Sequence, residues 1–359
     1  MIYLDNAATT QPYAQALTTF YNVSRENWMN PSSSLYSSAA KIELNTARQK
    51  IAEIVGVDPK SILFTSGSTE AANWVLSGAW SHIITSELEH PCVYNAAIHS
   101  SAEIHIVEND TTGKINLVNL ADILEWCSSA GGNILVAIMG ANNEIGTIQP
   151  IHEIGDLVHC YRSARYFCDT TQLWPHKKID PTGMDFACMS AHKFGGLKGV
   201  GFLYAKDPSS LSPLLYGGHQ EFGLRAGTEN VAGVVAMAEA LRITELYKGD
   251  CSAEIRKQIL SHREYTFNGA ADGVESIVSM TMPDSDAQKM VAALGLEGIY
   301  ISAGSACSTG SPEPSRILTA IGLSPEEANR TLRISYGLKT RSSDIEKLFE
   351  KIKYYRELL

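Results

Sequence analysis

Residues 184–201 read MDFACMSAHKFGGLKGVG, and the rest of the chain is organised around this segment. The short apolar run Phe186–Met189 is typical of a strand that is buried on both faces of a sheet. Lys193 follows this predicted strand, and four of the eight residues at 194–201 are glycine. Burial lowers the pKa of a lysine and makes its amine a nucleophile that can form a Schiff base. A bare S-x-H-K pattern is, however, more often an ordinary lysine in a surface loop.

The composition is that of an ordinary globular protein. Of the 359 residues, 44% are hydrophobic and 19% are charged, and the net charge of -10 argues against a basic nucleic-acid-binding face. No apolar run reaches the roughly 18 residues of a membrane span, and the N-terminus MIYLD does not resemble a signal peptide, so we expect a cytoplasmic protein. The seven cysteines include no C-x-x-C pair, which favours reduced thiols over disulfides or structural zinc, and no bound metal is expected.

A turn that suits a phosphate is predicted at 66–70. The sequence ILFT at 62–65 predicts a strand, SGSTE at 66–70 a tight polar turn, and residues 71–79 a helix. Hydroxyls, free backbone N–H groups and the positive end of the helix dipole together bind a phosphate at such a turn. Simple N-capping by serine or threonine explains the same residues without any ligand.

Other polar residues follow predicted strands. Strands at 82–86, 134–139 and 166–168 alternate with helices, which predicts a mostly parallel sheet with helices on both faces. Open sheets of this kind bind ligands at the carboxyl ends of their strands. The side chains expected at that edge are Thr69, His90, Asn143, Asp169, Gln172 and Lys193. A single histidine or aspartate in such a place is usually structural, so only the set as a whole indicates a site.

The chain changes character after Tyr204. A glycine-rich loop, YGGHQEFGLRAGT at 216–228, precedes a predicted helix of small residues from about 229 to 246. Three further strands alternate with helices beyond it, and they are predicted at 277–282, 299–302 and 331–335. This change indicates a second, smaller domain.

The predicted fold class is therefore α/β. We expect a large domain, residues 13–245, with a mostly parallel sheet of the seven-stranded type flanked by helices. Residues 1–12 and 246–359 are expected to form a smaller α+β domain. Its segment ISAGSACSTGSPEPS at 301–315 is typical of an exposed loop. Free cysteines usually pack as buried hydrophobes, so Cys307 in this loop indicates a reactive thiol.

A lysine, a strand-end aspartate, a phosphate-ready turn, a histidine and a loop cysteine together indicate pyridoxal phosphate (PLP). That cofactor needs a lysine, an acid opposite its pyridine nitrogen, and a phosphate cradle. The chain also resembles the NifS/IscS-like cysteine desulfurases of the class-V aminotransferase group. The matching stretches follow the family order over nearly the whole chain, and they are YLDNAATT, NPSS, ILFTSGSTEAAN, TSELEH, NNEIGTIQPI, CDTTQ, MSAHK, GLRAGTEN, GSACSTGSPEPS and LRISYG. Jointly these motifs are highly specific.

The resemblance implies a role for each matching residue around the cofactor ring. Lys193 would carry the cofactor on its amine and move the Cα proton of the substrate. Asp169 would pair with the pyridine nitrogen and keep the ring an electron sink. His90 would stack on the ring and shuttle protons on the substrate thiol, and Gln172 and Asn143 would lie near the ring hydroxyl.

Further residues are implied to hold the charged groups. The phosphate ligands that the resemblance implies are Ser68, Thr69, Ser190 and His192. Thr228 would reach the phosphate of the neighbouring subunit, so a homodimer is implied. Arg333 would bind the substrate carboxylate through two parallel hydrogen bonds, as a planar guanidinium can, with Asn143 beside it.

The implied reaction converts L-cysteine to L-alanine. The Cys307 thiolate attacks the substrate sulfur, and the resulting persulfide passes to a protein acceptor, either an Fe–S scaffold or another sulfur carrier. A flexible loop suits a thiol that must visit both substrate and acceptor. Housekeeping members often carry a further tail for the Fe–S scaffold, whereas this chain ends at Leu359 soon after its last predicted helix, so that particular acceptor is less strongly implied.

Some positions depart from the family pattern. Ala191 stands where glycine is common, Phe222 where arginine is usual, and Ala226 where serine is usual. Phe194–Leu197 replaces the usual Ile-Tyr-Gly-Pro. None of these changes removes a catalytic group, and their effect is expected at the active-site entrance and the acceptor surface.

Three alternatives stay open at this point. A selenocysteine lyase or an aminotransferase of the same fold is the first, although an aminotransferase would not need Cys307. A non-catalytic sulfur-relay scaffold is the second, although such a protein could lose Lys193 and Cys307 freely. A dinucleotide-binding dehydrogenase is disfavoured, because the glycines after Lys193 lack the G-x-G-x-x-G order and an acidic residue about twenty positions on.

Overall fold

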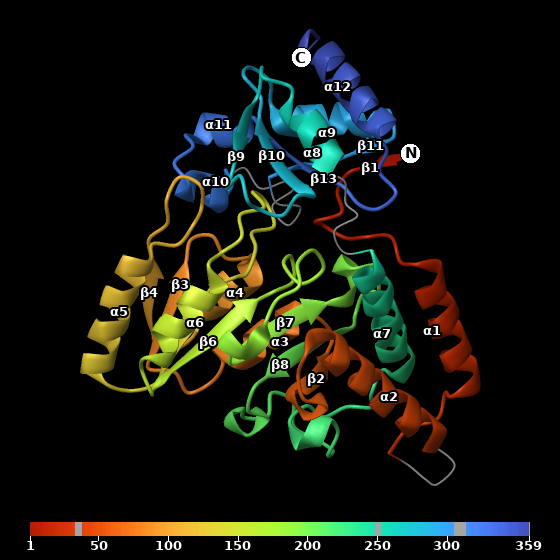
Figure 1. The fold of residues 1–359 in the computed structure, drawn as a ribbon, viewed down its shortest axis with the longest axis vertical. Coiled ribbons are helices and arrows are strands. Elements are labelled where there is room, and N and C mark those ends of the chain that lie inside the picture. Colours follow the sequence, from red (N-terminus) through yellow and green to blue (C-terminus); the bar gives the residue numbers. More distant parts are fainter. Residues whose placement is uncertain (33–37, 248–252, 305–313, 359) are drawn as a thin grey trace.

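The computed structural model describes residues 1–32, 38–247, 253–304 and 314–358, and its larger part is built on one seven-stranded sheet (Figure 1). The strand order is β2-β8-β7-β6-β5-β3-β4. In that order the strands span Ile62–Thr65, Gly201–Ala205, Phe186–Ser190, Ala164–Asp169, Ile134–Ala137, His82–Ser86 and Glu103–Val107. Neighbouring strands from β7 to β4 pair in parallel, and β8 is antiparallel to β7 and β2. The prediction of a mostly parallel sheet is confirmed.

The strand predicted within 184–201 is β7, and all five of its residues are buried. Alternate side chains of a strand point to opposite faces of its sheet. Ala187 and Met189 accordingly belong to the apolar cluster on one face, and Phe186 and Cys188 belong to the cluster on the other. The continuous apolar run in the sequence thus reflects burial on both faces.

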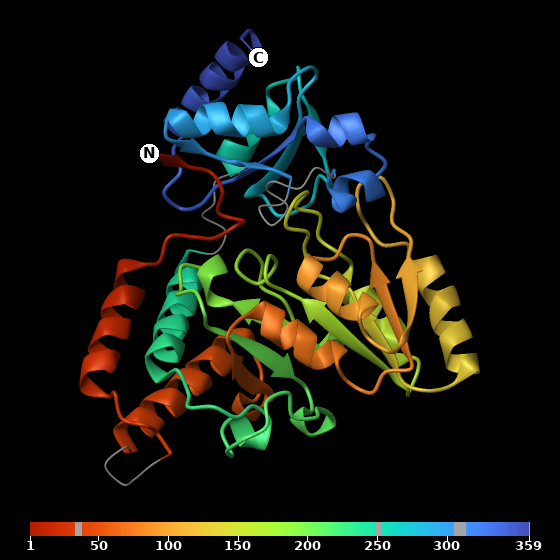
Figure 2. The same ribbon diagram turned by 180° about the vertical axis from the view of Figure 1, so that it is seen from behind.

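Helices cover both faces of the large sheet. On the face of Phe186 lie α3 and α4, which Figure 2 shows in front of the strands, and α2, α5, α6 and α7 lie on the face of Met189. α1 packs against α7. In chain order the helices of this part are α1 Ala14–Glu26, α2 Ser38–Val55, α3 Ser68–Leu76, α4 Pro91–Ile98, α5 Leu117–Ala130, α6 Ile151–His159 and α7 Val231–Leu246.

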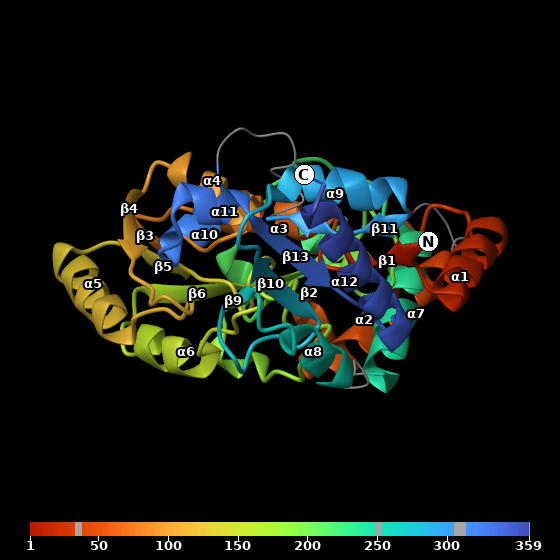
Figure 3. The ribbon, with the colours of Figure 1, turned by 90° about the horizontal axis from the view of Figure 1, so that it is seen from above.

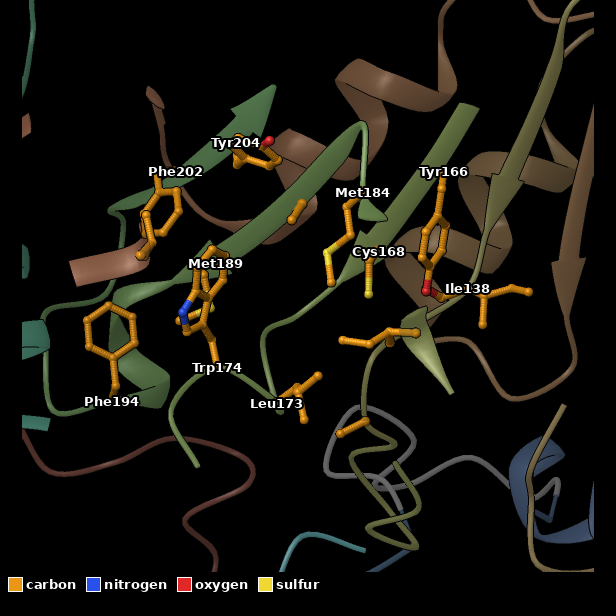
Figure 4. Packing of buried hydrophobic residues seen from close by; sticks show 14 of the residues in the cluster. Ile138, Tyr166, Cys168, Leu173, Trp174, Met184, Met189, Phe194, Phe202 and Tyr204 are labelled. Carbon is orange, nitrogen blue, oxygen red and sulfur yellow. The ribbon is translucent and has the colours of Figure 1, made fainter. Parts of the chain in front are cut away.

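Large side chains fill the space beside the ends of β6, β7 and β8. Figure 4 shows Trp174, Met189 and Phe202 close together in this part of the core. The rings of Trp174 and Phe202 meet edge to face with their centres 6.0 Å apart, an arrangement that aromatic pairs favour. This packing holds in place the strand ends that carry the polar residues.

A smaller antiparallel sheet lies above those strand ends in Figure 1. Its strands, in the order β12-β13-β10-β9, span Ser302–Ala303, Thr331–Ser335, Ile277–Thr281 and Thr266–Asn268. The remaining helices are α8 Ala253–Leu260, α9 Ala287–Leu296, α10 Arg316–Ala320, α11 Pro325–Asn329 and α12 Ser342–Arg356. Of these, α8, α9 and α12 enclose a separate apolar core with the small sheet.

The N-terminal strand belongs in space to the C-terminal part of the chain. β1, Ile2–Tyr3, pairs in parallel with β11, Ile299–Tyr300, and Leu4 joins the core of the small sheet. Figure 3 shows β1 beside β11, α9 and α12 from above. The predicted domain limits near residues 12 and 245 stay a prediction.

The structure differs from the predicted elements in several places. The strand predicted at 299–302 is divided, because 299–300 pairs with β1 whereas 302–303 pairs with β13. α3 begins at Ser68 rather than near residue 71, so the second half of the predicted turn forms the first turn of the helix. Several elements add to those predicted, and they are α1, α4, β4, α5, β8, α8, β9, α10 and α11. Within the described ranges, every helix is too short or too polar to cross a membrane.

Candidate active site

The carboxyl ends of the parallel strands gather polar residues at one edge of the large sheet. β6 ends at Asp169 and β7 at Ser190, while His90 follows β3 and Asn143 follows β5. Arg333 of β13 reaches the same edge from the small sheet, because its Nη1 donates to the backbone oxygen of Asn143 at 3.0 Å. Residues predicted from separate stretches of sequence are therefore brought together here.

Lys193 ends the short turn that follows β7. Its amine donates to the backbone oxygens of Ala7 at 2.6 Å and Ala8 at 2.9 Å. The turn can pack this closely because Gly195 has φ +77°, and a Cβ atom there would lie 2.2 Å from the ring of Tyr13. The half-buried amine is thus held at the strand end, unlike a lysine that extends into solvent.

Ala7 also contacts a second predicted site residue. Its carbonyl oxygen accepts a hydrogen bond from Nε2 of Gln172 at 2.8 Å. One backbone oxygen therefore orients both Lys193 and Gln172. The sequence reasoning assigned no role to Ala7 or Ala8, because a backbone carbonyl has no residue-type signature; the only available signal was the family match of the stretch YLDNAATT.

Asp169 places a buried carboxylate at the end of β6. Its Oδ1 accepts from the backbone N–H of Thr171 at 3.0 Å and from the thiol of Cys188 at 3.4 Å. Burial, reinforced by the charge of Asp169, raises the pKa of the Cys188 thiol, so the sulfur keeps its proton and serves as the donor. A carboxylate buried in this way is best stabilised by a nearby cationic group.

His90 caps the N-terminus of α4. Its Nδ1 accepts from the backbone N–H of Cys92 at 3.2 Å and lies 3.0 Å from the Cys92 sulfur. Burial lowers the pKa of His90, and the charge of Lys193 adds to this while Asp169 opposes it. The ring is therefore neutral at neutral pH, and since Nδ1 accepts, the ring proton resides on Nε2.

Three hydroxyls meet at the N-terminus of α3. The Oγ of Ser190 accepts from the backbone N–H of Ser68 at 2.8 Å, and the Oγ of Ser68 lies 3.0 Å from that of Ser190 and 2.6 Å from Oγ1 of Thr171. Gly201 of β8 and Gly67, which precedes α3, approach each other closely. A Cβ atom on Gly201 would lie only 2.7 Å from the Cα of Gly67, so this approach requires glycine at position 201. Hydroxyls at a helix N-terminus suit a phosphate, and Thr171 is an addition to the predicted set.

The other predicted phosphate ligands make no hydrogen bond with these three hydroxyls in the described part of the chain. His192 places its Nδ1 3.1 Å from Oγ1 of Thr9, and burial lowers the pKa of His192 to about 4, so the ring is neutral. Thr69 is exposed in the first turn of α3. Thr228 is also exposed, and within the described part of the chain no hydrogen bond joins it to the three hydroxyls. Cys307 lies outside the described residues.

Arg333 is buried with an ionic partner and one orphaned donor. The side chain is 2% exposed, and Nη2 donates to Oδ1 of Asp5 at 2.6 Å and to Oγ of Ser302 at 3.2 Å. Neither Nε of Arg333 nor Oδ1 of Asn143 has a hydrogen-bond partner among the described residues. Buried polar atoms without partners are rare, so these two atoms on contacting residues indicate a polar ligand.

The wall behind His90 contains two further residues that the sequence reasoning missed. Glu89 is fully buried, and Arg316 donates from Nη2 to its backbone oxygen at 2.7 Å. The guanidinium of Arg316 also donates to the backbone oxygen of Glu87 and lies 3.7 Å from the ring centre of Tyr94. The first residue of α10 is thereby fixed to the segment that carries His90.

Comparisons with known proteins agree with this arrangement. A model of the class-V aminotransferase family matches residues 2–348, so the chain belongs to that family. The cysteine desulfurase IscS of Methanosarcina thermophila is 34% identical over 98% of this chain and 91% of its own. A NifS-like protein of known structure superposes with a TM-score of 0.91 at 28% identity over the whole of both chains. A structure described as SspA in complex with cysteine has a TM-score of 0.81 at 31% identity over 93% of this chain and 98% of that one.

Members of this family depend on PLP, and the residues present suit that cofactor. Lys193 offers a half-buried amine and Asp169 a buried carboxylate, as the aldehyde and the ring nitrogen of PLP require. The hydroxyls of Ser68 and Ser190 lie at a helix N-terminus, where a phosphate is favoured. The unpartnered Oδ1 of Asn143 leaves a polar atom for a ligand in the same region.

Proposed function

We propose that this chain is a PLP-dependent cysteine desulfurase that converts L-cysteine to L-alanine and carries the sulfur on Cys307. The observation that carries the proposal is the meeting of Lys193, Asp169 and His90 at one edge of the large sheet. A lysine amine, a buried acid and a neutral histidine are the groups that PLP chemistry on a thiol-bearing amino acid requires. The curated relative named cysteine desulfurase IscS supports the same reaction.

The residues that would hold the cofactor form two groups, one at its ring and one at its phosphate. Lys193 would carry PLP on its amine, Asp169 would pair with the ring nitrogen, and Gln172 would lie near the ring hydroxyl. The phosphate would be bound by Ser68, Thr69, Ser190 and His192. When bound, PLP withdraws electrons from the substrate and so weakens the bonds at its Cα and Cβ atoms.

The chain's own groups supply the remaining chemistry. Nε of Arg333, which has no partner among the described residues, would donate to the substrate carboxylate, and the side-chain amide of Asn143 would lie beside it. The Lys193 amine, released from the cofactor when the substrate amine takes its place, would take the Cα proton, and His90 would exchange a proton with the substrate thiol through Nε2. The Cys307 thiolate attacks the substrate sulfur, so an S–S bond forms as the Cβ–S bond breaks. The Cβ carbon keeps the electron pair of that bond and gains a proton, Lys193 returns the proton to Cα, and alanine leaves.

Product analysis of the purified protein tests this function. With L-cysteine and a reductant, we expect a yellow protein that releases sulfide and alanine in equal amounts. Lys193→Ala should lower turnover by at least about 10²–10⁴-fold, the usual contribution of a general acid–base group. Cys307→Ser should keep the yellow colour and lose sulfide release. A yellow wild-type protein that forms no sulfide would contradict the desulfurase, and a chain that cannot take up PLP would also contradict the roles of Lys193 and Asp169.

We further infer that the enzyme is a homodimer in which Thr228 reaches the phosphate of the neighbouring subunit. Thr228 is exposed, as such a role requires, and the nearby Tyr216 and Phe222 are 85% and 58% exposed. The segment is nevertheless fixed, because Glu221 accepts two hydrogen bonds from the buried Arg48 at 2.6 and 2.9 Å. An exposed but anchored segment with large apolar side chains fits a subunit interface.

Subunit complementation tests this arrangement. Thr228→Asp places a negative charge beside the neighbour's phosphate and should abolish activity. Lys193→Ala should also abolish activity, because it removes the lysine that the other subunit contributes to the same site. When the two variants are mixed and allowed to exchange subunits, a heterodimer contains one site with both Lys193 and Thr228 intact. Random exchange makes about half of the dimers heterodimers, and each heterodimer has one working site of two. We therefore expect activity to return toward about a quarter of the wild-type value. Mixed dimers that remain inactive would contradict a shared site.

We also propose that the persulfide passes to a protein sulfur acceptor in the cytoplasm, either an Fe–S scaffold or another sulfur carrier. The outer sulfur of a persulfide is transferred by attack of a thiolate, so the acceptor must present a cysteine. Reduced, scattered cysteines in this chain fit a reducing compartment. Without any thiol acceptor, we expect about one alanine per chain and then arrest.

A further inference from the structure

Two histidines and a cysteine face one another at the far end of β3 from His90. His82 is the first residue of β3, and His105 is the central residue of β4. Cys127 lies in α5, and one ring nitrogen of each histidine and the Cys127 sulfur all lie within 4.8 Å of one another. None of these three residues has a part in the proposed reaction.

The fold explains why the three side chains meet. β3 and β4 pair in parallel with His82 opposite Glu103, so Glu103 and His105, two residues apart on β4, share one face with His82. This is the face that α5 covers, and Cys127 is fully buried in the cluster beneath it. The arrangement at the β4 edge of the sheet can be followed in Figure 1.

The spacing of the two imidazoles suits a tetrahedral metal. Nδ1 of His82 and Nε2 of His105 are 3.2 Å apart. Two nitrogens bound at the usual zinc distance in a tetrahedron are separated by about 3.3–3.4 Å. The separation of the two nitrogens, which is also that of a hydrogen bond between the rings, is therefore already near that of a pair bound to one ion, and the Cys127 sulfur lies within 4.8 Å of both.

A backbone carbonyl already orients the His82 ring for this task. Nε2 of His82 lies 3.2 Å from the carbonyl oxygen of Gly131, to which it donates when the proton is on that nitrogen. Gly131 ends α5 with φ +86°, and Gly132 follows with φ +96°, so the tight turn toward β5 requires glycine at both positions. Metal-binding histidines usually donate their second N–H to such a group, which leaves the other nitrogen for the ion.

The surroundings provide a fourth ligand and a partial shield. Oε2 of Glu103 lies 3.6 Å from Nδ1 of His82, and its side chain is 58% exposed, so it can turn toward an ion or leave room for water. The ring of Trp126 packs against both imidazoles, with centres 5.7 Å from His82 and 5.2 Å from His105. His82 itself is only 6% exposed.

We propose that His82, His105 and Cys127 bind one divalent cation of the zinc class, with Glu103 or a water molecule completing a tetrahedron. Imidazole and thiolate ligands select zinc and related transition metals over magnesium and calcium, which prefer oxygen. On binding, the Cys127 thiol releases one proton and the histidines remain neutral. The ion joins β3, the edge strand β4 and α5. A metal at this site would revise the expectation that the protein binds none. That expectation rested on the lack of a C-x-x-C motif, and ligands from three separate elements do not produce such a motif.

Zinc binding by the holoenzyme tests the site once competing thiols are removed. In the full chain carrying Cys92→Ser and Cys307→Ser, dialysis against zinc buffered by a chelator should leave one zinc per chain and raise the melting temperature. Adding Cys127→Ser or His105→Asn should weaken zinc affinity by at least about 100-fold. Loss of a group that only hydrogen-bonds to a metal ligand already weakens affinity by up to about 100-fold, and loss of a ligand itself should cost at least as much. The control change Cys160→Ser alters an exposed thiol and should have no effect.

Cobalt provides a readout that requires no change within the site. Co²⁺ added to the Cys92→Ser, Cys307→Ser protein should show the intense visible absorption of a tetrahedral ion and a thiolate-to-cobalt band. The proposal is overturned if this protein binds less than one zinc per chain, if the cobalt spectrum is that of an octahedral ion without sulfur, or if folded Cys127→Ser and His105→Asn proteins bind zinc as tightly as their parent.

Discussion

Glu89 is a fully buried acid directly before His90. Its Oε1 accepts from the hydroxyl of Ser86 at 2.9 Å and the backbone N–H of Met139 at 3.0 Å, while Oε2 has no partner among the described residues. Burial raises the pKa of this carboxyl to about 8, and the nearby charge of Asp169 acts in the same direction. Glu89 is therefore mostly protonated at neutral pH, which keeps a second negative charge away from Asp169.

This protonation makes the stability of the protein depend on pH. A carboxyl whose pKa is higher in the folded state binds more protons when folded, so its stabilising effect is complete below the unfolded value of about 4.3 and is lost as the pH rises toward 8. We expect this group alone to lower the free energy of unfolding by up to about 1.4 kcal/mol per pH unit in that window.

Glu89→Gln should remove this pH dependence, because glutamine resembles the protonated acid in shape and hydrogen bonding. The measurement is urea denaturation of wild type and variant from about pH 5 to about pH 8, the window of the shift. The stability of the variant relative to wild type should increase steadily with pH. The exposed control Glu346→Gln should show a constant difference. A constant difference for Glu89→Gln would contradict the raised pKa.

The strand ends are the elements that set the geometry of the site, and they could be predicted from the sequence. The apolar run before Ser190 and the strand ending at Asp169 locate Lys193 and Asp169 because a strand buried on both faces leaves a clear local pattern. The pairing of β1 with β11 could not be predicted, because strands of two residues carry no periodicity and their pairing is decided by the tertiary fold. The Ala7 carbonyl beside Lys193 could not be predicted either, because a backbone carbonyl has no residue-type signature.

The close approach of β8 to the start of α3 depends on Gly201. A Cβ atom there would lie 2.3 Å from the backbone oxygen of Met189 and 2.7 Å from the Cα of Gly67. We expect Gly201→Ala to destabilise the protein by at least about 1–3 kcal/mol, as overpacking does, and to weaken retention of PLP. Denaturant titration and PLP absorbance measure the two effects. Gly295→Ala, in α9 with nothing near its Cβ, should instead be neutral or stabilising by up to about 1 kcal/mol. Equal effects of the two changes would contradict this account.

The turn before Thr228 is held by a buried ion pair. Glu221 and Phe222 adopt φ +44° and +60°, a region that is costly for these residues. Glu221 offsets this cost by accepting from Arg48 and from the backbone N–H of Phe64 at 2.8 Å. Glu221→Ala leaves the Arg48 charge buried without its partner, and we expect a loss of about 3–5 kcal/mol of unfolding free energy.

A surface ion pair offers the matched control for Glu221. Glu239 accepts from Arg242 one helical turn away, with the arginine side chain 52% exposed. Glu239→Ala should therefore cost less than about 1 kcal/mol in the same denaturation experiment. If Glu221→Ala proves equally mild, the ion pair does not anchor the turn.

At the scale of the whole molecule, the first ten residues connect the two sheets across the site. Asp5 pairs with Arg333 of the small sheet, and Ala7 accepts from Lys193, which follows β7 of the large sheet. Thr10 then donates through its backbone N–H to the carbonyl oxygen of His192 at 2.8 Å. The groups proposed to bind the substrate carboxylate and the cofactor are thus joined by one short segment, whose path is visible in Figures 1 and 2.

The central claim is that this site transfers sulfur from L-cysteine to one cysteine of the chain. The most direct measurement is a single turnover with L-cysteine and no reductant, followed by thiol trapping, digestion and mass spectrometry of every cysteine-containing peptide. We predict one additional sulfur atom on the Cys307 peptide in wild type, and none on any peptide of Lys193→Ala. An unmodified Cys307 in a PLP-loaded protein that forms alanine, or extra sulfur on a different cysteine, would contradict the account.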